Sequence, residues 1–169
     1  MKTLMLMRHA KAAWPETEIP DRDRELKSKG HRQAERMSAH LGGRLEAPQR
    51  IYCSDARRTR ETLPPFLRAW SLAEEEVVVY EPGLYLATDH QLLEEIARWP
   101  DGLDRVMLVG HNPGLTDLVN RLTSRETYLK NLRPCAVVVL TLPVKAWAEI
   151  LPGTAAVSLH LRPKELKEE

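Results

Sequence analysis

Leu4-Met5-Leu6-Met7-Arg8-His9 joins an uninterrupted apolar run to an adjacent arginine and histidine. A short apolar run of this kind predicts a buried central strand. In open α/β sheets, ligands and reacting groups gather where strands end at their carboxyl edge. Arg8 offers a planar fork of donors for phosphate oxygens, and His9 can attack phosphorus or carry protons. The stretch predicts a first strand with a phosphoryl-binding pair, Arg8 and His9, at its end. The alternative is that these two residues lie in a loop and are solvated.

The rest of the chain alternates between strand and helix patterns. Strands are predicted over residues 3–7, 50–53, 77–80, 105–109, 135–142 and 157–161. Helices are predicted over residues 28–44, 56–70 with a break at Pro64-Pro65, 91–99 and 113–122. Ser54 and Asp55 are expected to cap the second helix and Asn112 the last one, with Pro113 as its first residue.

This order of elements predicts a three-layer α/β/α sandwich with a mixed, mostly parallel sheet. The last two strands follow one another without a good helix between them, so at least one of them should run antiparallel. Apolar and polar residues alternate over 157–161, which is typical of a half-exposed strand near an edge.

Composition limits the classes of protein to consider. The 169 residues suit one domain, expected over 1–169, and 43% of them are hydrophobic. The net charge of +1 argues against a broad nucleic-acid surface. Two distant cysteines, Cys53 and Cys135, are expected to be reduced thiols. The first apolar run is too short for an export signal, and no stretch is long enough to span a bilayer, so we expect a soluble, cytoplasmic protein with no membrane partner.

Three predicted strand ends carry related chemistry. The first has Arg8-His9, the second leads into residues 54–62 with several arginines, and the fourth leads into Gly110-His111-Asn112-Pro113. In a doubly wound sheet these three ends can meet over one carboxyl edge. The helix N-termini there would present free N–H groups to an anion.

These segments resemble the histidine phosphatase superfamily, whose fold is phosphoglycerate mutase-like. Residues 6–10 resemble its Arg-His-Gly signature, residues 53–62 its Ser-x-x-x-Arg-Ala-x-x-Thr segment with Arg58 as the family arginine, and residues 109–113 its second histidine motif. The short length, residues 21–30, Gly83-Leu84-Tyr85 and residues 162–166 are similar to the SixA-type branch, whose named activity is phosphohistidine phosphatase.

The resemblance implies a phosphoric hydrolase with defined roles. His9 would be the nucleophile and become transiently phosphorylated. Arg8 and Arg58 would hold the phosphoryl oxygens, and His111, expected to be protonated, would donate to the phosphoryl group. No metal and no cofactor is implied, because side-chain cations take the place of a metal ion.

Several other residues have two interpretations. Ser54 is expected either to bind phosphate or to cap a helix, and Asn112 to be a cap or a further phosphate-binding residue. Trp14 either lines the pocket mouth or anchors its loop. The loop from Asp21 to Arg24 either contacts a leaving group or is solvated.

Two departures from the family pattern bear on the substrate. Ala10 replaces the signature glycine, which is a small change. Larger members place a glutamate after the third strand, but residues 84–87 contain no carboxylate. Glu81 and Asp89 flank this gap and are the alternatives for a general acid. Loss of that acid would slow ester hydrolysis by roughly 10²–10⁴-fold, so the sequence favours P–N substrates.

The sequence therefore predicts a metal-independent phosphatase that acts on phosphohistidine in a protein. Two other functions stay open: a phosphatase or phosphoramidase for a small phosphorylated metabolite, and a non-catalytic phosphate-binding module. The intact set of Arg8, His9, Arg58 and His111 weighs against the last. A monomer is the default expectation, and no nucleic-acid partner is expected.

Overall fold

The first apolar run forms a fully enclosed strand of a six-stranded sheet. The computed structural model describes residues 1–166. The strands are β1 (Lys2–Arg8), β2 (Arg50–Ser54), β3 (Val78–Glu81), β4 (Arg105–Gly110), β5 (Val137–Leu142) and β6 (Ala156–Leu161). Each of the residues from Leu4 to Met7 is at most 1% exposed, which confirms the prediction of a buried central strand.

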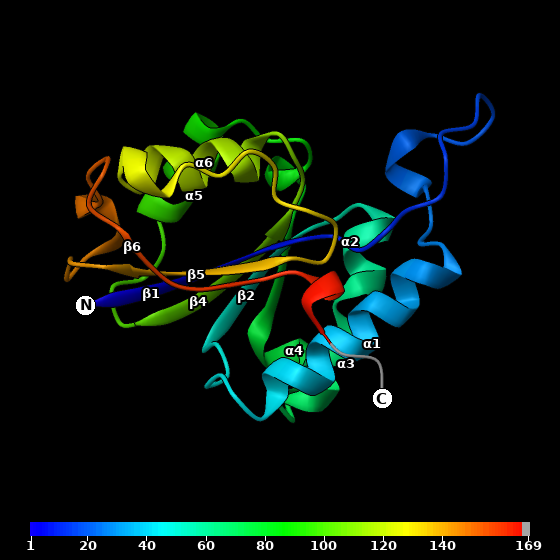
Figure 1. The fold of residues 1–169 in the computed structure, drawn as a ribbon, viewed down its shortest axis with the longest axis horizontal. Helices are drawn as coiled ribbons and strands as arrows, with labels where there is room; N and C mark the ends of the chain where they lie inside the picture. The colour runs from blue at the N-terminus through cyan, green and yellow to red at the C-terminus, as the bar shows by residue number, and fades with distance from the viewer. Residues whose placement is uncertain (167–169) are drawn as a thin grey trace.

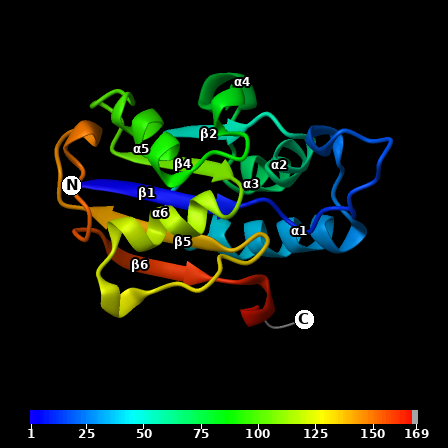
Figure 2. The same cartoon turned by 90° about the horizontal axis from the view of Figure 1, so that it is seen from above.

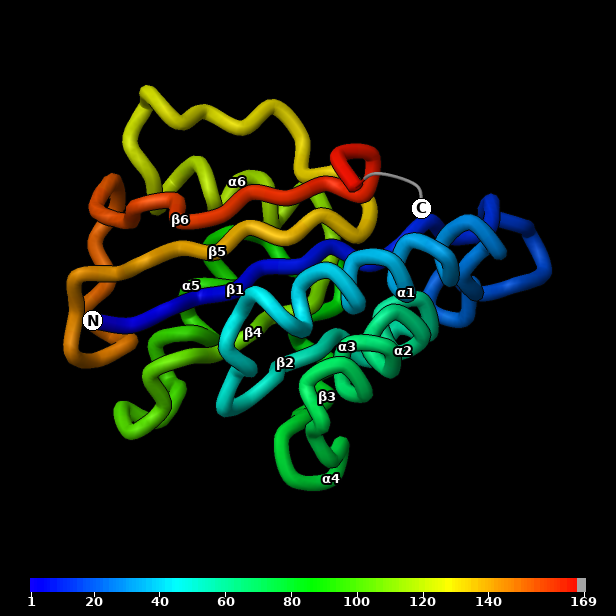
Figure 3. Tube along the Cα trace, turned by 60° about the horizontal axis from the view of Figure 1, so that its bottom comes forward, coloured from blue at the N-terminus to red at the C-terminus, as the bar shows by residue number. Residues whose placement is uncertain are grey.

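The strand order is β3-β2-β4-β1-β5-β6, as Figure 3 shows. Strands β3, β2, β4 and β1 are mutually parallel, whereas β5 runs antiparallel to both β1 and β6. The predicted mixed, mostly parallel sheet is therefore confirmed, and β6 lies at its edge. The three strands that carry the candidate motifs, β2, β4 and β1, are immediate neighbours.

Helices cover both faces of the sheet, so the predicted three layers are also confirmed (Figure 1). The helices are α1 (Ser28–Gly42), α2 (Arg57–Thr62), α3 (Pro64–Ala69), α4 (Glu74–Val77), α5 (Asp89–Ala97) and α6 (Gly114–Leu122). All of them, within residues 1–166, are too short or too polar to cross a membrane.

Alternate residues of β1 serve the two cores. Leu4 and Leu6 pack in the cluster that includes residues of α5 and α6. Met5 and Met7 pack on the other face, with residues of α1 and α3. Figure 2 looks onto the α6 face, where the neighbouring strands lie side by side behind the helix. Because successive side chains of a strand point to opposite faces, one central strand ties both helical layers to the site that follows it.

Some predicted boundaries were wrong. The N-cap of α2 is Ala56, not Ser54 or Asp55, and α6 begins after Pro113 rather than at it. The break predicted at Pro64-Pro65 is confirmed, because Pro64 starts a new helix after Leu63.

The fifth strand also starts later than predicted. Cys135 has a φ of 60°, in the left-handed region, and its N–H donates to the carbonyls of Arg8 and His9 at 3.0 and 3.1 Å. A non-glycine residue in this conformation breaks the strand pattern that its apolar side chain predicts. The turn instead ties residue 135 to the end of β1, beside the candidate site.

Candidate active site

The carboxyl ends of β1, β4 and β2 bring the two candidate histidines and the family arginine together. The register pairs Arg8 with Gly110, so His9 and His111 follow adjacent strands at the same level. Their ring centroids are 5.4 Å apart. Arg58 lies in the first turn of α2, just beyond β2. The expected meeting of three motifs at one sheet edge is what the structure shows.

His9 is held with one ring nitrogen engaged. Its Nδ1 lies 2.7 Å from the carbonyl oxygen of Ala10 and therefore donates its hydrogen there. The lone pair is left on Nε2, the form that a nucleophile requires. Burial, together with the charges of Arg58 and Arg8 and against the opposing effect of the Ala10 hydrogen bond, lowers the pKa of His9 to about 3. The imidazole is thus neutral at neutral pH.

Two close contacts fix the chain around His9. The Thr62 hydroxyl accepts the N–H of Ala10 at 3.0 Å and donates to the carbonyl of Arg58 at 2.7 Å. On the other side, a Cβ on Gly30 would lie 2.2 Å from the carbonyl oxygen of Lys11. Only glycine permits this approach of α1 to the segment after His9. Thr62 therefore couples the positions of the nucleophile and the arginine.

The arginines leave buried donors directed into the site. Arg58 is 3% exposed, and Arg8 donates from Nη1 to the carbonyl of Leu132 at 3.1 Å. Among residues 1–166, the buried Nε atoms of Arg8, Arg24 and Arg58 have no hydrogen-bond partner. Burial, Arg133 and Arg58 lower the pKa of Arg8. A cluster of like charges with unused donors is suited to an anion.

His111 is buried next to Ser54. Its Nε2 lies 2.7 Å from Ser54 Oγ, while its buried Nδ1 has no partner among the described residues. Burial, with His9 and Arg58, lowers the pKa of His111 to about 3, because a dry position between cations disfavours another positive charge. His111 is therefore neutral in the protein alone, and its protonation beside a bound phosphoryl group stays a prediction.

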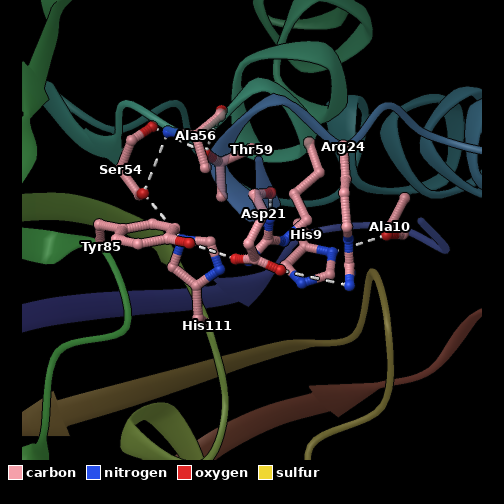
Figure 4. A network of polar contacts seen from close by, with 10 residues as sticks. His9, Ala10, Asp21, Arg24, Ser54, Ala56, Thr59, Tyr85 and His111 are labelled. Atoms are coloured by element: carbon pink, nitrogen blue, oxygen red, sulfur yellow. Dashed lines mark hydrogen bonds and ion pairs between the residues drawn. The ribbon is translucent and has the colours of Figure 1, made fainter. Parts of the chain in front are cut away.

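Asp21 lies in the loop expected either to contact a leaving group or to be solvated, and it supplies a carboxylate to the site. It lies in a short 3-10 turn, Asp21–Asp23, and its side chain reaches Arg58 Nη2 at 3.1 Å and Arg24 Nη1 at 3.4 Å. The backbone carbonyl of Asp21 also accepts from Arg58 Nη1 at 2.7 Å. Figure 4 shows the carboxylate between the Tyr85 hydroxyl, which donates to it, and Arg24. The hydrogen bond from Tyr85, then Arg58 and Arg24, lower the pKa of Asp21.

The two remaining predicted phosphate ligands have different positions. Ser54 is fully buried, accepts the N–H of Ala56 at 3.3 Å and faces His111, so it lies within the site. The Asn112 amide is engaged by the protein: Oδ1 accepts from Thr116, and Nδ2 donates to Asn131 and the Leu132 carbonyl. Asn112 is therefore not the cap itself: it lies one residue before the N-cap, Pro113, and its side chain orders the loop that also receives Arg8.

The flanking carboxylates and Trp14 lie apart from this network. Asp89 pairs with Arg121 at 2.8 Å. Burial raises the pKa of Asp89, but the hydrogen bond and the charge of Arg121 hold this pKa below its ordinary value. Glu81 ends β3 opposite Ser54 in the register. Trp14 is 71% exposed, with Lys27 and Lys11 over its ring at 4.5 and 5.5 Å, so it anchors a surface loop.

The other potential nucleophile and metal ligands do not form a second centre. Burial raises the pKa of Cys53 to about 12, so its thiol stays protonated. Across residues 1–166, no three histidine, cysteine, aspartate or glutamate side chains are grouped as metal ligands would be.

Comparisons with known proteins agree with this site. Residues 4–84 match the family described as the histidine phosphatase superfamily (branch 1). An uncharacterized protein of Mycobacterium tuberculosis is 32% identical over 164 residues, covering 92% of this chain and 99% of its own length. The structure of a putative phosphohistidine phosphatase SixA from Agrobacterium tumefaciens has a TM-score of 0.82 and 26% identity, covering 96% of this chain and 98% of that one.

A second solved structure is similar over almost the same span. The putative phosphohistidine phosphatase SixA from Nakamurella multipartitia has a TM-score of 0.80 and 30% identity, with 96% of both chains covered. This chain and the two SixA structures are similar over nearly their whole length. The sheet and the histidines at its strand ends agree with that similarity. The chain belongs to the histidine phosphatase superfamily, in its SixA-type branch of phosphoric ester hydrolases.

Proposed function

We propose that this protein is a metal-independent phosphatase that removes the phosphoryl group from phosphohistidine in a protein, through a phosphorylated His9. The observation that carries the proposal is the neutral His9 ring, held by its Nδ1 on Ala10 and surrounded by Arg8, Arg58 and His111. A site for binding alone would not require an oriented, uncharged imidazole among cations.

In the proposed first step, the Nε2 lone pair of His9 attacks phosphorus, and the bond from phosphorus to the leaving group breaks. Arg8 and Arg58 stabilise the charge on the phosphoryl oxygens. A substrate phosphohistidine that carries a proton on its other ring nitrogen leaves as neutral imidazole, so the step needs no acid from the enzyme.

In the second step, water attacks the phosphorus of phosphorylated His9 and the P–Nε2 bond breaks. Because Nδ1 keeps its hydrogen on the Ala10 carbonyl, His9 also leaves as a neutral ring. Both protons of the water remain on inorganic phosphate. The same hydrogen bond thus prepares His9 as nucleophile and later as leaving group.

The carboxylates near the site support a P–N substrate over an ester. Asp89 is engaged by Arg121, and Asp21 is held ionised by Tyr85 and Arg58. An ionised carboxylate cannot protonate an alkoxide, and residues 84–87 contain no acid. Two similar solved structures are of putative phosphohistidine phosphatases. The second candidate, a phosphatase for a small phosphorylated metabolite, would need Glu81, which ends β3 opposite Ser54, as its general acid.

A comparison of substrates tests the proposal. The purified protein is given a phosphohistidine peptide, p-nitrophenyl phosphate and a sugar phosphate, with and without EDTA. We expect EDTA-resistant hydrolysis of the peptide and the activated ester, and turnover of the sugar phosphate slower by roughly 10²-fold or more. A requirement for a divalent metal, or preference for the sugar phosphate, would contradict the proposal.

The lowered pKa of His111 predicts that the protein takes up a proton when an anion binds. A dianion beside His111 favours its charged form, so the pKa of His111 should rise from about 3 when the anion binds. Titration calorimetry with tungstate at about pH 6, close to the ordinary histidine pKa, should give a binding enthalpy that depends on the ionisation enthalpy of the buffer. His111→Gln should reduce the uptake. Binding without buffer dependence, or uptake unchanged in the variant, would assign the proton elsewhere.

We further propose that residues 1–169 act as one catalytic domain, as a cytoplasmic monomer. Support comes from the single sheet, whose central strand contributes to both cores. Sedimentation of the purified protein tests the monomer.

A further inference from the structure

A long groove runs beside the candidate active site, between α1 and the last described residues of the chain. Its volume is about 1340 Å³. One wall is α1, and the facing wall is formed by residues 161–166, with Arg133-Pro134 and Lys11 also lining the groove. In Figure 1 the C-terminal turn, drawn in red, lies next to α1. Neither the site described above nor its proposed mechanism uses this groove.

The α1 wall is a continuous basic stripe. Lys29, Arg32, Arg36 and Arg44 all line the groove, with His40 between the last two. Lys29, Arg32 and Arg36 are spaced by three and four residues, so they share one face of α1, whereas Arg44 lies two residues beyond the end of the helix at Gly42. From Lys29 to His40 the helical part of the stripe is about 16 Å long, at a rise of about 1.5 Å per residue.

The facing wall and the near end of the groove add positive charge. Arg162 and Lys164 come from the C-terminal segment, and Arg133 and Lys11 lie toward the active site. In total, eight lysines and arginines and one glutamate line the groove, although the whole chain has a net charge of only +1. The positive charge of the molecule is therefore concentrated on this surface.

Few basic residues of the groove have carboxylate partners, although Arg36 donates from Nη2 to the carbonyl of Leu166 on the facing wall at 2.8 Å. Within residues 1–166, the ion pairs include Arg162 with Glu165 but none of the other seven lysines and arginines. Elsewhere, exposed arginines such as Arg68 and Arg105 are paired with glutamates. A groove with several unpaired cations focuses an attractive field on acidic groups.

One end of the groove lies near the site. Lys11 follows His9 by two positions, and Arg133 follows Leu132, whose carbonyl receives the Arg8 guanidinium. The charge of Arg133 also lowers the pKa of Arg8. A ligand whose phosphoryl group enters the pocket would therefore meet this end of the groove first. The helical part of the stripe matches about five extended residues or three turns of helix.

We propose that this groove binds an acidic surface of the phosphorylated protein, next to the phosphohistidine that enters the active site. The inference rests on the proposed function and adds a substrate class: phosphohistidine flanked by aspartate and glutamate. Arginine suits carboxylates because its donors form a planar fork. The lining also contains Ala39, Leu161 and Leu166 but no phenylalanine, tyrosine or tryptophan, so it offers contact to a polypeptide and lacks the large aromatic side chains on which nucleic-acid bases usually stack.

The test uses two synthetic phosphohistidine peptides of equal length. One carries aspartate and glutamate on one side of the phosphohistidine, and the other carries asparagine and glutamine at the same positions. The groove variant is Arg32→Glu with Lys164→Glu, one from each wall. The matched control is Arg125→Glu with Lys145→Glu, two exposed residues outside the groove with the same change in charge.

The wild type should have a kcat/KM at least about tenfold higher for the acidic peptide. The preference should be present at about 0.01 M salt and largely lost at about 1 M, where the Debye length falls to about 3 Å. The groove variant should lose the preference and keep its p-nitrophenyl phosphate activity, whereas the control variant should behave as the wild type. Equal turnover of both peptides by the wild type, or a preference that survives in the groove variant, would overturn the inference.

Binding of the unphosphorylated acidic peptide, followed by fluorescence anisotropy, separates this inference from the proposed function. If neither phosphopeptide is hydrolysed but the wild type binds this peptide and the groove variant does not, the groove assignment stands and the proposed function fails. If both peptides are hydrolysed equally, the proposed function stands and the groove assignment fails. A third outcome is that inorganic polyphosphate binds to the wild type but not to the groove variant, while the acidic peptide is not preferred. The groove would then be a general polyanion site, and the inference would be overturned.

Discussion

His9→Ala should reduce phosphohistidine hydrolysis by about 10⁴-fold or more, because nucleophile removal in covalent catalysis costs on that order. The change removes the Nε2 lone pair that the Ala10 hydrogen bond orients. With a phosphohistidine substrate labelled in its phosphoryl group, rapid quenching should trap an acid-labile, alkali-stable label on the wild type and none on His9→Ala. Tungstate binding should persist in the variant, because the arginines remain.

His31→Ala is the matched control, since His31 is an exposed histidine on α1 that no side-chain contact links to the site. It should retain wild-type turnover. Thermal melts of all three proteins check that loss of activity is not loss of folding. Appreciable turnover by folded His9→Ala, or a label that remains on it, would exclude His9 as the nucleophile.

Arg58→Ala should lower kcat/KM by about 10²–10³-fold, the range found when one transition-state donor is removed. Arg58 also lowers the pKa of His9 and of Asp21, so its loss should raise both. As the solution is acidified, His9 of the variant then becomes protonated at a higher pH than His9 of the wild type. The acidic limb of the kcat/KM profile for p-nitrophenyl phosphate should therefore move to higher pH than in the wild type.

The neighbouring Arg57→Ala provides a close comparison, because Arg57 lies in the same helical turn but faces solvent and pairs with Glu25. That variant should keep the wild-type rate and pH profile. If Arg58→Ala slows the reaction without moving the acidic limb, Arg58 does not act on His9 through its charge. Equal losses in the two variants would point to helix disruption instead.

The sequence predicted the layers, the mixed sheet and the meeting of three strand ends, because those features follow from apolar periodicity and chain order. Leu4 to Met7 is apolar on both faces, as a strand between two helical layers must be. The limits of elements were less predictable. Cys135 looked like strand, but two carbonyls at the end of β1 hold it in a turn, and that contact spans most of the chain.

The candidate site could be predicted in its residues more than in its protonation states. Motif spacing located Arg8, His9, Arg58 and His111, and the structure brings them together. The charge of His111 could not be predicted, because it depends on burial and on neighbours that only the fold supplies. The place of Asp21 was left between a contact to the leaving group and a solvated loop for a similar reason: no local pattern shows that a polar loop folds back onto an arginine 37 positions away.

The position of Asp21 has a consequence for inhibition by the product. Its carboxylate is tethered near Arg58, so it competes with free anions at an effective concentration on the order of millimolar for a short loop. On the proposed function, inorganic phosphate and the phosphoryl group of the substrate would both have to displace this carboxylate to reach Arg58. The loop that carries Asp21 would then weaken the binding of product and of substrate alike, so the affinity of the pocket for phosphate would be set in part from a surface loop.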